Sequence, residues 1–295
     1  MKVYLSSPSA KLMQELMLRC EGIQLNILVS MAILPNNYEA FLKNFESIIS
    51  TIILDNGAFS ALNSNIGMTT GQLLHKFKKH CEKHKDRYQI IFSPDFEFGP
   101  DGFEKNYEHF LDMEELRIDV APVVHNLNNG EIEAYLSHNP EYIAIGQCEG
   151  RRNPSNLFPA VYRLNNHGVK VHLFGITDFD LLAGCPAYSC DSKSWLDDST
   201  TGVVRFWNSE RQEQNKTDIL YFPEYLGQKR EGTIPYYDYT YIDVFESFIK
   251  ARLDLTIDDF LGLKAGLSRE LANAVYYNDL SQIVTNIHIS DGIVF

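Results

Sequence analysis

Three aspartates of this chain occupy equivalent places, each at the carboxyl end of a short apolar run. Asp55 and Asp191 follow their runs directly, and Asp95 follows its run after one proline. Carboxylates without a bound metal ion can catalyse reactions at an acetal carbon. One carboxylate attacks the anomeric carbon, and a second donates and accepts protons. Carboxylates also accept hydrogen bonds from the N–H groups of a flat heterocycle, whose faces stack on aromatic rings. The residue types therefore indicate glycosyl transfer or the binding of a nucleobase-like ring.

Other residues at or just after the ends of apolar runs complete the candidate site. They are aromatic, histidine, glycine or amide residues: Phe59, His125, Gly146, Gln147, Phe174 and Gly175. Each candidate has an ordinary structural alternative, because Asp55-Asn56-Gly57 is a common turn sequence, Asp95 can cap a helix, and histidine and phenylalanine can belong to the core. Asp191 is the hardest to explain in this way, since it has no helix start to cap beyond its own loop. The shared position favours one common site.

No metal ion and no cofactor are expected at this site. No cluster of residues has the spacing of metal ligands, and the sequence contains neither GxSxG nor a phosphate-binding glycine loop. The five cysteines are scattered without a CxxC pair, which is typical of reduced thiols in a cytoplasmic protein.

The candidate residues share a site only if the apolar runs belong to one parallel sheet. Eight such runs alternate with helical patterns, which predicts an α/β fold, a (β/α)8 TIM-type barrel whose site lies at the carboxyl ends of its strands. A doubly wound open sheet is the alternative, but no GxGxxG loop follows the first run. The predicted strands are Lys2–Ser6, Asn26–Ser30, Thr51–Leu54, Tyr88–Ser93, Ala121–Val124, Tyr142–Ile145, Val169–Phe174 and Ala187–Cys190.

The last third of the chain has a different pattern. We expect residues 1–195 to form the barrel core and residues 196–295 to form a mixed α/β extension that packs on it and is not an independent domain. The extension is predicted to contain a strand at Gly202–Trp207, helices at Ile242–Leu253, Thr256–Lys264 and Ser268–Tyr277, and an apolar tail, Ile283–Phe295, that packs back on the body.

Composition bears on partners and location. The net charge is −13 and the isoelectric point is near 5.1, which argues mildly against a nucleic-acid partner, although a local basic patch can coexist with a negative total. No run of about 18 apolar residues is present, and the first residues lack the apolar block of a signal peptide. A cytoplasmic protein without a membrane partner is expected.

Four segments of this sequence resemble motifs of the tRNA-guanine transglycosylase superfamily. The closest likeness is to the branch, found in phages and bacterial DNA-modification clusters, that inserts 7-deazaguanines into DNA. The segments are LDNGAFS (Leu54–Ser60), YIAIGQ (Tyr142–Gln147), HLFGIT (His172–Thr177) and YSCDSKSW (Tyr188–Trp195). The resemblance covers roughly residues 1–200, and the order and spacing of the motifs are more specific than any one of them.

The resemblance implies roles for the candidate residues. Asp191 would be the nucleophile, and Asp55 would be the acid and base that protonates the departing guanine. Asp95 and His125 would read the polar edge of the base, and the backbone at Gly146 and Gln147 would bind its carbonyl. The rings of Phe59 and Phe174, the latter next to Gly175, would enclose the base between them.

Two departures from the family shape the prediction. No cysteine follows Cys190, so the zinc-binding element of the tRNA enzymes is absent and DNA rather than tRNA is the expected polymer. His125 stands where the family has glutamine, which favours a modified 7-deazaguanine over guanine.

The predicted function is a base-exchange transglycosylase that replaces guanine in a polynucleotide with a free 7-deazaguanine such as preQ0. Two alternatives remain: an enzyme that acts on tRNA, and a non-catalytic nucleobase-binding subunit. A basic partner protein could provide the contacts with nucleic acid.

Overall fold

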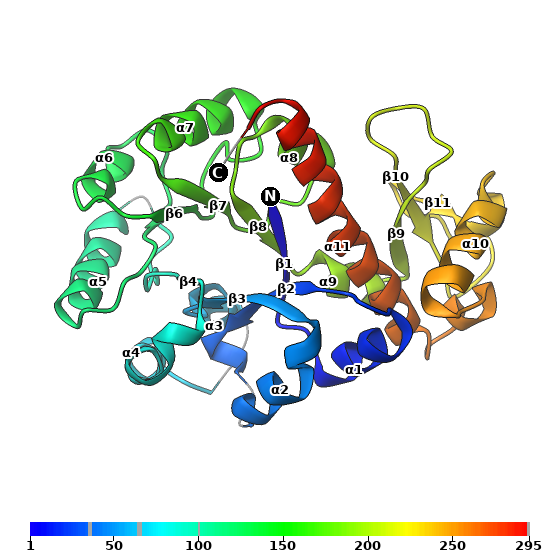
Figure 1. Cartoon of the computed structure of the whole chain (residues 1–295), viewed down its shortest axis with the longest axis horizontal. Helices are drawn as coiled ribbons and strands as arrows, with labels where there is room; N and C mark the ends of the chain where they lie inside the picture. The colour runs from blue at the N-terminus through cyan, green and yellow to red at the C-terminus, as the bar shows by residue number, and fades with distance from the viewer. Residues whose placement is uncertain (35–36, 64–66, 100, 294–295) are drawn as a thin grey trace.

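Eight parallel strands form a TIM-type barrel in the computed structural model, which describes residues 1–34, 37–63, 67–99 and 101–293 (Figure 1). The strand order is β4-β3-β2-β1-β8-β7-β6-β5, so neighbours in the sheet are neighbours in sequence except where β1 pairs with β8. The (β/α)8 fold predicted from the sequence is therefore confirmed. The strands are β1 (Lys2–Ser6), β2 (Leu25–Ser30), β3 (Ile49–Asp55), β4 (Ile90–Ile91), β5 (Val123–Val124), β6 (Tyr142–Ile145), β7 (Lys170–Leu173) and β8 (Ser189–Ser192).

The barrel closes at a narrow seam between β4 and β5. A single parallel bridge joins Phe92 to Ala121, with hydrogen bonds from Ala121 N to Ile91 O (2.7 Å) and from Ser93 N to Ala121 O (2.9 Å). Both strands are shorter than the predicted runs. Pro122 has no N–H to donate, which limits the ladder on this side of β5.

Helices cover the outside of the barrel (Figure 1). Most of them bury apolar side chains on one face, and the clearest begin at a capping side chain: Ser9 accepts from Leu12 N at 3.1 Å, and Thr69 and Gln72 form a capping box. The helices of this region are α1 (Ala10–Arg19), α2 (Tyr38–Phe45), α3 (Ala58–Asn63), α4 (Thr70–His84), α5 (Phe103–Glu115), α6 (Glu131–Leu136), α7 (Pro154–Asn166), α8 (Phe179–Gly184) and α9 (Ser194–Thr200), with 3-10 turns η1 (Met31–Ile33), η2 (Glu46–Ile48) and η3 (Lys85–Arg87).

The helix that covers β1 comes from the end of the chain. α11 (Gly266–Ser290) packs on β1, α8, α9 and α1, and in Figure 1 it fills the place in the ring between α8 and α1. Ser281 Oγ and Thr285 Oγ1 donate to Met1 O at 3.1 Å and 2.9 Å, which ties this helix to the start of β1. The last helix of the barrel therefore lies beyond residue 195, in the segment that we expected to form the extension.

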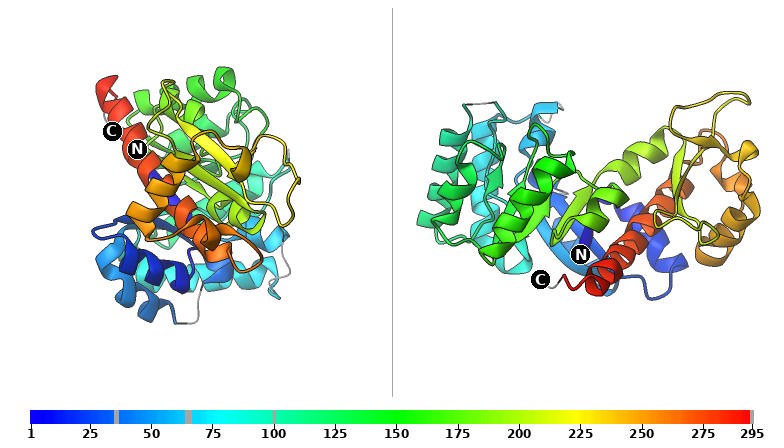
Figure 2. Two further views of the ribbon diagram at one scale, coloured as in Figure 1. Left: turned by 90° about the vertical axis from the view of Figure 1, so that its right-hand side faces the viewer. Right: turned by 90° about the horizontal axis from the view of Figure 1, so that it is seen from above.

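A small second sheet lies to one side of the barrel (Figure 2). It has the order β11-β10-β9, in which β9 and β10 are antiparallel and β10 and β11 are parallel. The elements here are β9 (Val203–Trp207), β10 (Thr217–Tyr221), β11 (Ile234–Pro235), η4 (Tyr236–Asp238), α10 (Ile242–Leu253) and η5 (Ile257–Phe260).

Two predictions about this region were wrong in detail. Thr256–Lys264 contains the short 3-10 turn η5 rather than a helix, and Ser268–Tyr277 is only part of the 25-residue α11, which continues into the expected tail. α11 is buried on several sides, so its apolar residues form no single stripe that would mark its length. None of the helices in the described ranges combines the length and the apolarity that a membrane crossing requires.

Asn273 is the clearest single link between α11 and the elements before it. It is fully buried, its Nδ2 donates to Trp195 O and Val203 O (both 3.1 Å), and its Oδ1 accepts from Arg205 N (2.7 Å). Asn273→Ala should lower the free energy of unfolding by about 3 kcal/mol, because the backbone groups stay buried without partners.

Urea unfolding followed by circular dichroism measures this change. Asn128→Ala, at an exposed position, is the control and should change stability by less than about 0.5 kcal/mol. Equal effects of the two variants would contradict the assigned role of Asn273.

Candidate active site

The side chains of the candidate site follow the alternation of the strands. Successive side chains of a strand point to opposite faces, so a residue two positions beyond one that fills the barrel interior faces the mouth. Interior and mouth residues are paired in this way as Ile53 and Asp55, Val123 and His125, Ala144 and Gly146, His172 and Phe174, and Ser189 and Asp191.

One cavity of about 300 Å³ opens at the carboxyl ends of the strands. All nine residues named from the sequence line it: Asp55, Phe59, Asp95, His125, Gly146, Gln147, Phe174, Gly175 and Asp191. This volume is at the small end of the range for ligand sites, which suits a ligand the size of a nucleobase.

Asp191 is held by two hydrogen-bond donors from neighbouring strand ends. The Ser6 hydroxyl donates to Oδ2 at 2.6 Å, and Gly175 N donates to Oδ1 at 3.0 Å. The residue is 8% exposed and lies inside β8, one position beyond the run predicted from the sequence. Its carboxylate is fixed in orientation at the edge of the cavity.

A fully buried histidine lies directly below this carboxylate. His172 Nε2 is 3.5 Å from Asp191 Oδ1, and Nδ1 is 2.9 Å from Ser189 Oγ. Its ring packs against Phe92 and Phe174, with centroid distances of 4.7 Å and 4.8 Å. His172 thus fills the barrel interior and limits how far the Asp191 side chain can retreat from the cavity.

Asp55 lies at the end of β3, and its pKa is raised from 3.8 to about 7. Burial of the carboxyl is the largest cause, and the negative charges of Asp95 and Asp191 add to it. Gly57 N donates to Asp55 Oδ2 at 3.1 Å. Gly57 has φ +87°, and a Cβ there would lie 2.6 Å from Ala32 N, so glycine is required for this turn.

Asp95 is shared between two neighbours in the floor of the cavity. Asn56 Nδ2 donates to Oδ1 at 2.7 Å, and His125 Nε2 lies 2.9 Å from Oδ2. The other ring nitrogen of His125 lies 3.2 Å from Gln147 O. Burial alone would lower the pKa of His125, but the hydrogen bond to Asp95 and its charge outweigh burial and raise that pKa. Both ring nitrogens of His125 therefore face acceptors within the protein.

Gly146 is packed against His125 and leaves no room for a side chain. A Cβ at Gly146 would lie 2.7 Å from His125 Cε1 and 2.8 Å from Val123 Cγ1. Gly146 N donates to Val124 O in the sheet. Of the backbone N–H groups of Gly146 and Gln147, that of Gln147 is therefore the one that can donate to a ligand. Arg151 Nη1 donates to Gly146 O (3.1 Å) and Phe174 O (3.0 Å) and so holds two strand ends together.

Aromatic rings form part of the cavity wall. Phe59 on α3 is 57% exposed, and its ring meets that of Phe98 edge to face at 6.5 Å. Phe98 in turn meets the ring of His125 at 5.0 Å. Phe174 lines the same cavity from the end of β7, and the centroid of its ring is 4.6 Å from that of Phe92. A planar ligand in this cavity would have aromatic surface available on its walls.

Sequence reasoning missed several residues that line the cavity. Ser6 and Ser30 end β1 and β2 and follow the same alternation, so their position was a usable signal. Phe98 comes from the loop after β4, and no local pattern marks it. Arg151 comes from the loop after β6, where the sequence marks it only as one of a basic pair with Arg152. In the described ranges no group of three or more histidine, cysteine, aspartate or glutamate side chains could hold a metal ion.

Comparisons with known proteins bear on the fold. No protein-family model matches this sequence, and no curated protein matches it. Among solved structures, a protein described as a fructose-1,6-biphosphate aldolase from Coccidioides immitis is similar with a TM-score of 0.52 at 8% identity, covering 98% of this chain and 92% of that one. The YdjI aldolase from Escherichia coli K12 has a TM-score of 0.42 at 15% identity, covering 68% and 77%. At these identities the first likeness shows the barrel fold alone.

The raised pKa of Asp55 makes the stability of the fold depend on pH. The folded carboxyl keeps its proton up to about pH 7, whereas the unfolded one loses it near pH 3.8, so wild type should lose stability as pH rises between these values. Asp55→Asn removes this titration. Relative to wild type, the variant should therefore gain on the order of 1–4 kcal/mol between pH 4 and pH 8.

Urea unfolding at several pH values measures the difference, and the pH 4 comparison is the internal control. A stability difference between Asp55→Asn and wild type that stays constant across this range would contradict a raised pKa at Asp55.

Proposed function

We propose that the chain is a base-exchange transglycosylase that replaces guanine in a polynucleotide, DNA first among the candidates, with a free 7-deazaguanine such as preQ0. The observation that supports this most is the placement of Asp55 and Asp191 in one base-sized cavity, together with the raised pKa of Asp55. A carboxylate oriented by donors and a second carboxyl that is protonated near neutral pH are the two groups that glycosyl exchange requires.

In the first half-reaction Asp191 attacks C1′ of the target nucleotide. A bond forms between a carboxylate oxygen and C1′, the bond from C1′ to N9 of guanine breaks, and its electron pair stays on N9. Asp55, protonated up to about pH 7, donates its proton to the departing guanine. The product is a glycosyl-aspartate ester and free guanine, which leaves the cavity.

The second half-reaction reverses these steps with another base. Asp55, now ionised, takes a proton from the ring nitrogen of the incoming 7-deazaguanine. That nitrogen attacks C1′, the ester bond breaks, and the electron pair returns to Asp191. One glycosidic bond is exchanged for another, so the reaction needs no external energy source.

Recognition of the base falls to Asp95 and to the backbone of Gln147. A carboxylate oxygen can accept more than one hydrogen bond, so Asp95 can accept from the N–H edge of a base while Asn56 and His125 keep it in place. His125 acts through Asp95 as a positioning residue. A nucleotide in a duplex must be flipped out to reach the cavity, at a cost of a few kcal/mol.

Asp191→Asn should abolish base exchange, because the amide cannot form the ester. Wild type, mixed with duplex DNA without an incoming base, should yield a protein–DNA adduct that survives denaturation. Gel electrophoresis and intact-protein mass spectrometry detect it.

Asp238→Asn, at an exposed carboxyl of the extension, is the control and should still form the adduct. An adduct that persists in Asp191→Asn would remove Asp191 as the nucleophile.

Asp95→Asn should weaken binding of the free base by about 10- to 100-fold, because one charged hydrogen-bond acceptor for the base edge is lost. Binding of the polynucleotide should change much less. Calorimetry with preQ0 and fluorescence anisotropy with labelled DNA measure the two affinities.

Glu97→Gln is the matched control, since Glu97 pairs with Lys105 and does not line the cavity. Equal losses of base and DNA affinity in Asp95→Asn would place Asp95 outside base recognition.

A further inference from the structure

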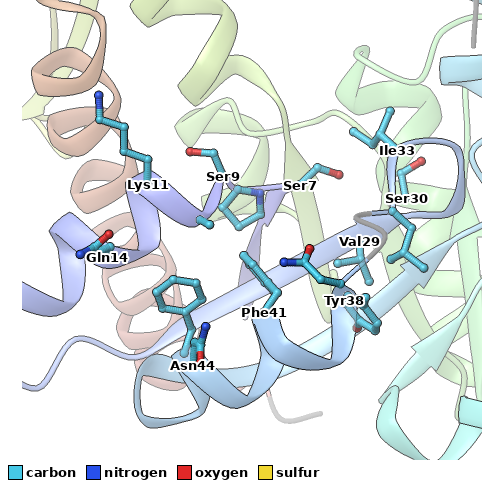
Figure 3. A pocket seen from close by; sticks show the side chains of 15 residues that line it. Ser7, Ser9, Lys11, Gln14, Val29, Ser30, Ile33, Tyr38, Phe41 and Asn44 are labelled. Atoms are coloured by element: carbon cyan, nitrogen blue, oxygen red, sulfur yellow. The ribbon is translucent and has the colours of Figure 1, made fainter.

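Two hollows continue outward from the catalytic cavity. The first, the α1–α2 hollow of about 490 Å³, shares Ser7, Ser30 and Ile33 with that cavity. Figure 3 shows Ser30 and Ile33 at one end of it and Lys11 and Gln14 at the other.

The second, the α2–α4 hollow of about 450 Å³, shares Leu34, Asn37 and Tyr38 with the first. The catalytic cavity and the two hollows therefore adjoin one another in a row that ends at α4, and we call this row the path.

Apolar side chains make up much of the lining of this path, and few of its polar groups carry negative charge. The α1–α2 hollow is lined by no carboxylate among the described residues, and its polar groups are hydroxyls, amides and Lys11. The α2–α4 hollow has one carboxylate, Glu39, which is already paired with Arg87 and lies 3.3 Å from His84 Nδ1. The path thus presents little negative charge, although the chain contains 39 acidic residues and has a net charge of −13.

The positive charge is concentrated on one face of α4. Lys76, Lys79 and Lys83 line the α2–α4 hollow, and their spacing of three and four residues places them in one row. An adjacent side of the helix buries Leu73 and Phe77.

The three lysines are exposed, and within the described ranges no ion pair engages them, whereas the neighbouring Lys78 pairs with Asp112. Segment 70–87 carries six lysine or arginine residues and only two acidic ones.

This row is long enough to meet more than one phosphate of a polyanion. Lys76 and Lys83 are separated by about 10 Å along the helix axis, so their ammonium groups can contact different phosphates of one strand. An acidic peptide could meet the same charges, but the path leads into a cavity that we assign to a nucleobase. Only a polynucleotide supplies a base for the cavity and phosphates for the lysines in one molecule.

We propose that the two hollows bind the sugar–phosphate backbone of the polynucleotide whose target nucleotide enters the catalytic cavity. The α4 lysines contact the phosphates, and the hydroxyl and amide groups of the α1–α2 hollow contact the segment between them and the flipped base. This inference rests on the proposed function and adds to it the face of the barrel over which the polymer runs.

The test is binding of short fluorescein-labelled duplex DNA to the full chain, measured by fluorescence anisotropy at several salt concentrations. The triple variant Lys76→Gln/Lys79→Gln/Lys83→Gln should lose at least about tenfold in affinity near 0.1 M salt. Its slope of log affinity against log salt should be smaller by roughly two to three, because three phosphate contacts are gone.

The matched control removes the same charge from the extension, in Lys229→Gln/Arg230→Gln/Lys264→Gln, all at exposed positions. It should bind DNA as wild type does, and thermal unfolding should show that both variants keep the wild-type fold.

The outcomes separate this inference from the proposed function. If wild type binds DNA and forms the adduct but the α4 variant binds equally well, the path over α4 is wrong and the transglycosylase proposal stands. Loss of binding in the extension control instead would move the polymer to that face. If polyglutamate binds as tightly as DNA in a manner that depends on the α4 lysines, the site is a general polyanion surface and the inference fails. If wild type binds no polynucleotide, both proposals fall together.

Discussion

The alternation of side chains along parallel strands, in a barrel closed on itself, is the constraint on which the candidate site depends. Interior residues such as Ile53 and Val123 meet in the middle of the barrel, and the residues two positions later have only the mouth to face. Because the sheet closes into a barrel, strands that are far apart in sequence direct these residues to the same mouth. A single bridge is enough to close the sheet between β4 and β5. The last helix, α11, completes the ring over β1.

Convergence places three carboxyl groups in one small cavity, and the surrounding groups give them different properties. The carboxylate of Asp95 is within hydrogen-bond distance of His125 Nε2, and that of Asp191 accepts hydrogen bonds from Ser6 and Gly175. Asp55 has a raised pKa, because the surrounding protein desolvates its carboxyl and the negative charges of the other two add to this effect. Environments that separate the roles of neighbouring carboxyl groups are typical of sites that combine a nucleophile with an acid and base.

Much of this arrangement could be predicted from the sequence, because the apolar runs and the alternation within them are local properties of the chain. The order of the strands followed from the (β/α)8 pattern of those runs and the helices between them. The predicted strands at Lys2–Ser6 and Tyr142–Ile145 match the structure residue for residue. The contribution of Phe98 and Arg151 could not be predicted, since loop conformation brings them to the cavity. The full length of the 25-residue helix α11 was also missed, because burial on several sides removes the periodicity that marks a surface helix. The roles assigned through the family resemblance stay predictions.

The central claim is that the cavity exchanges one base for another on a polymer. The most direct measurement is to incubate the wild-type chain with radiolabelled preQ0 and either duplex DNA or tRNA, and then to count the label in each purified polymer. We predict that label enters DNA, that free guanine is released in equal amount, and that Asp191→Asn transfers none. Absence of label from both polymers, with the chain folded and preQ0 bound, would contradict base exchange as its function.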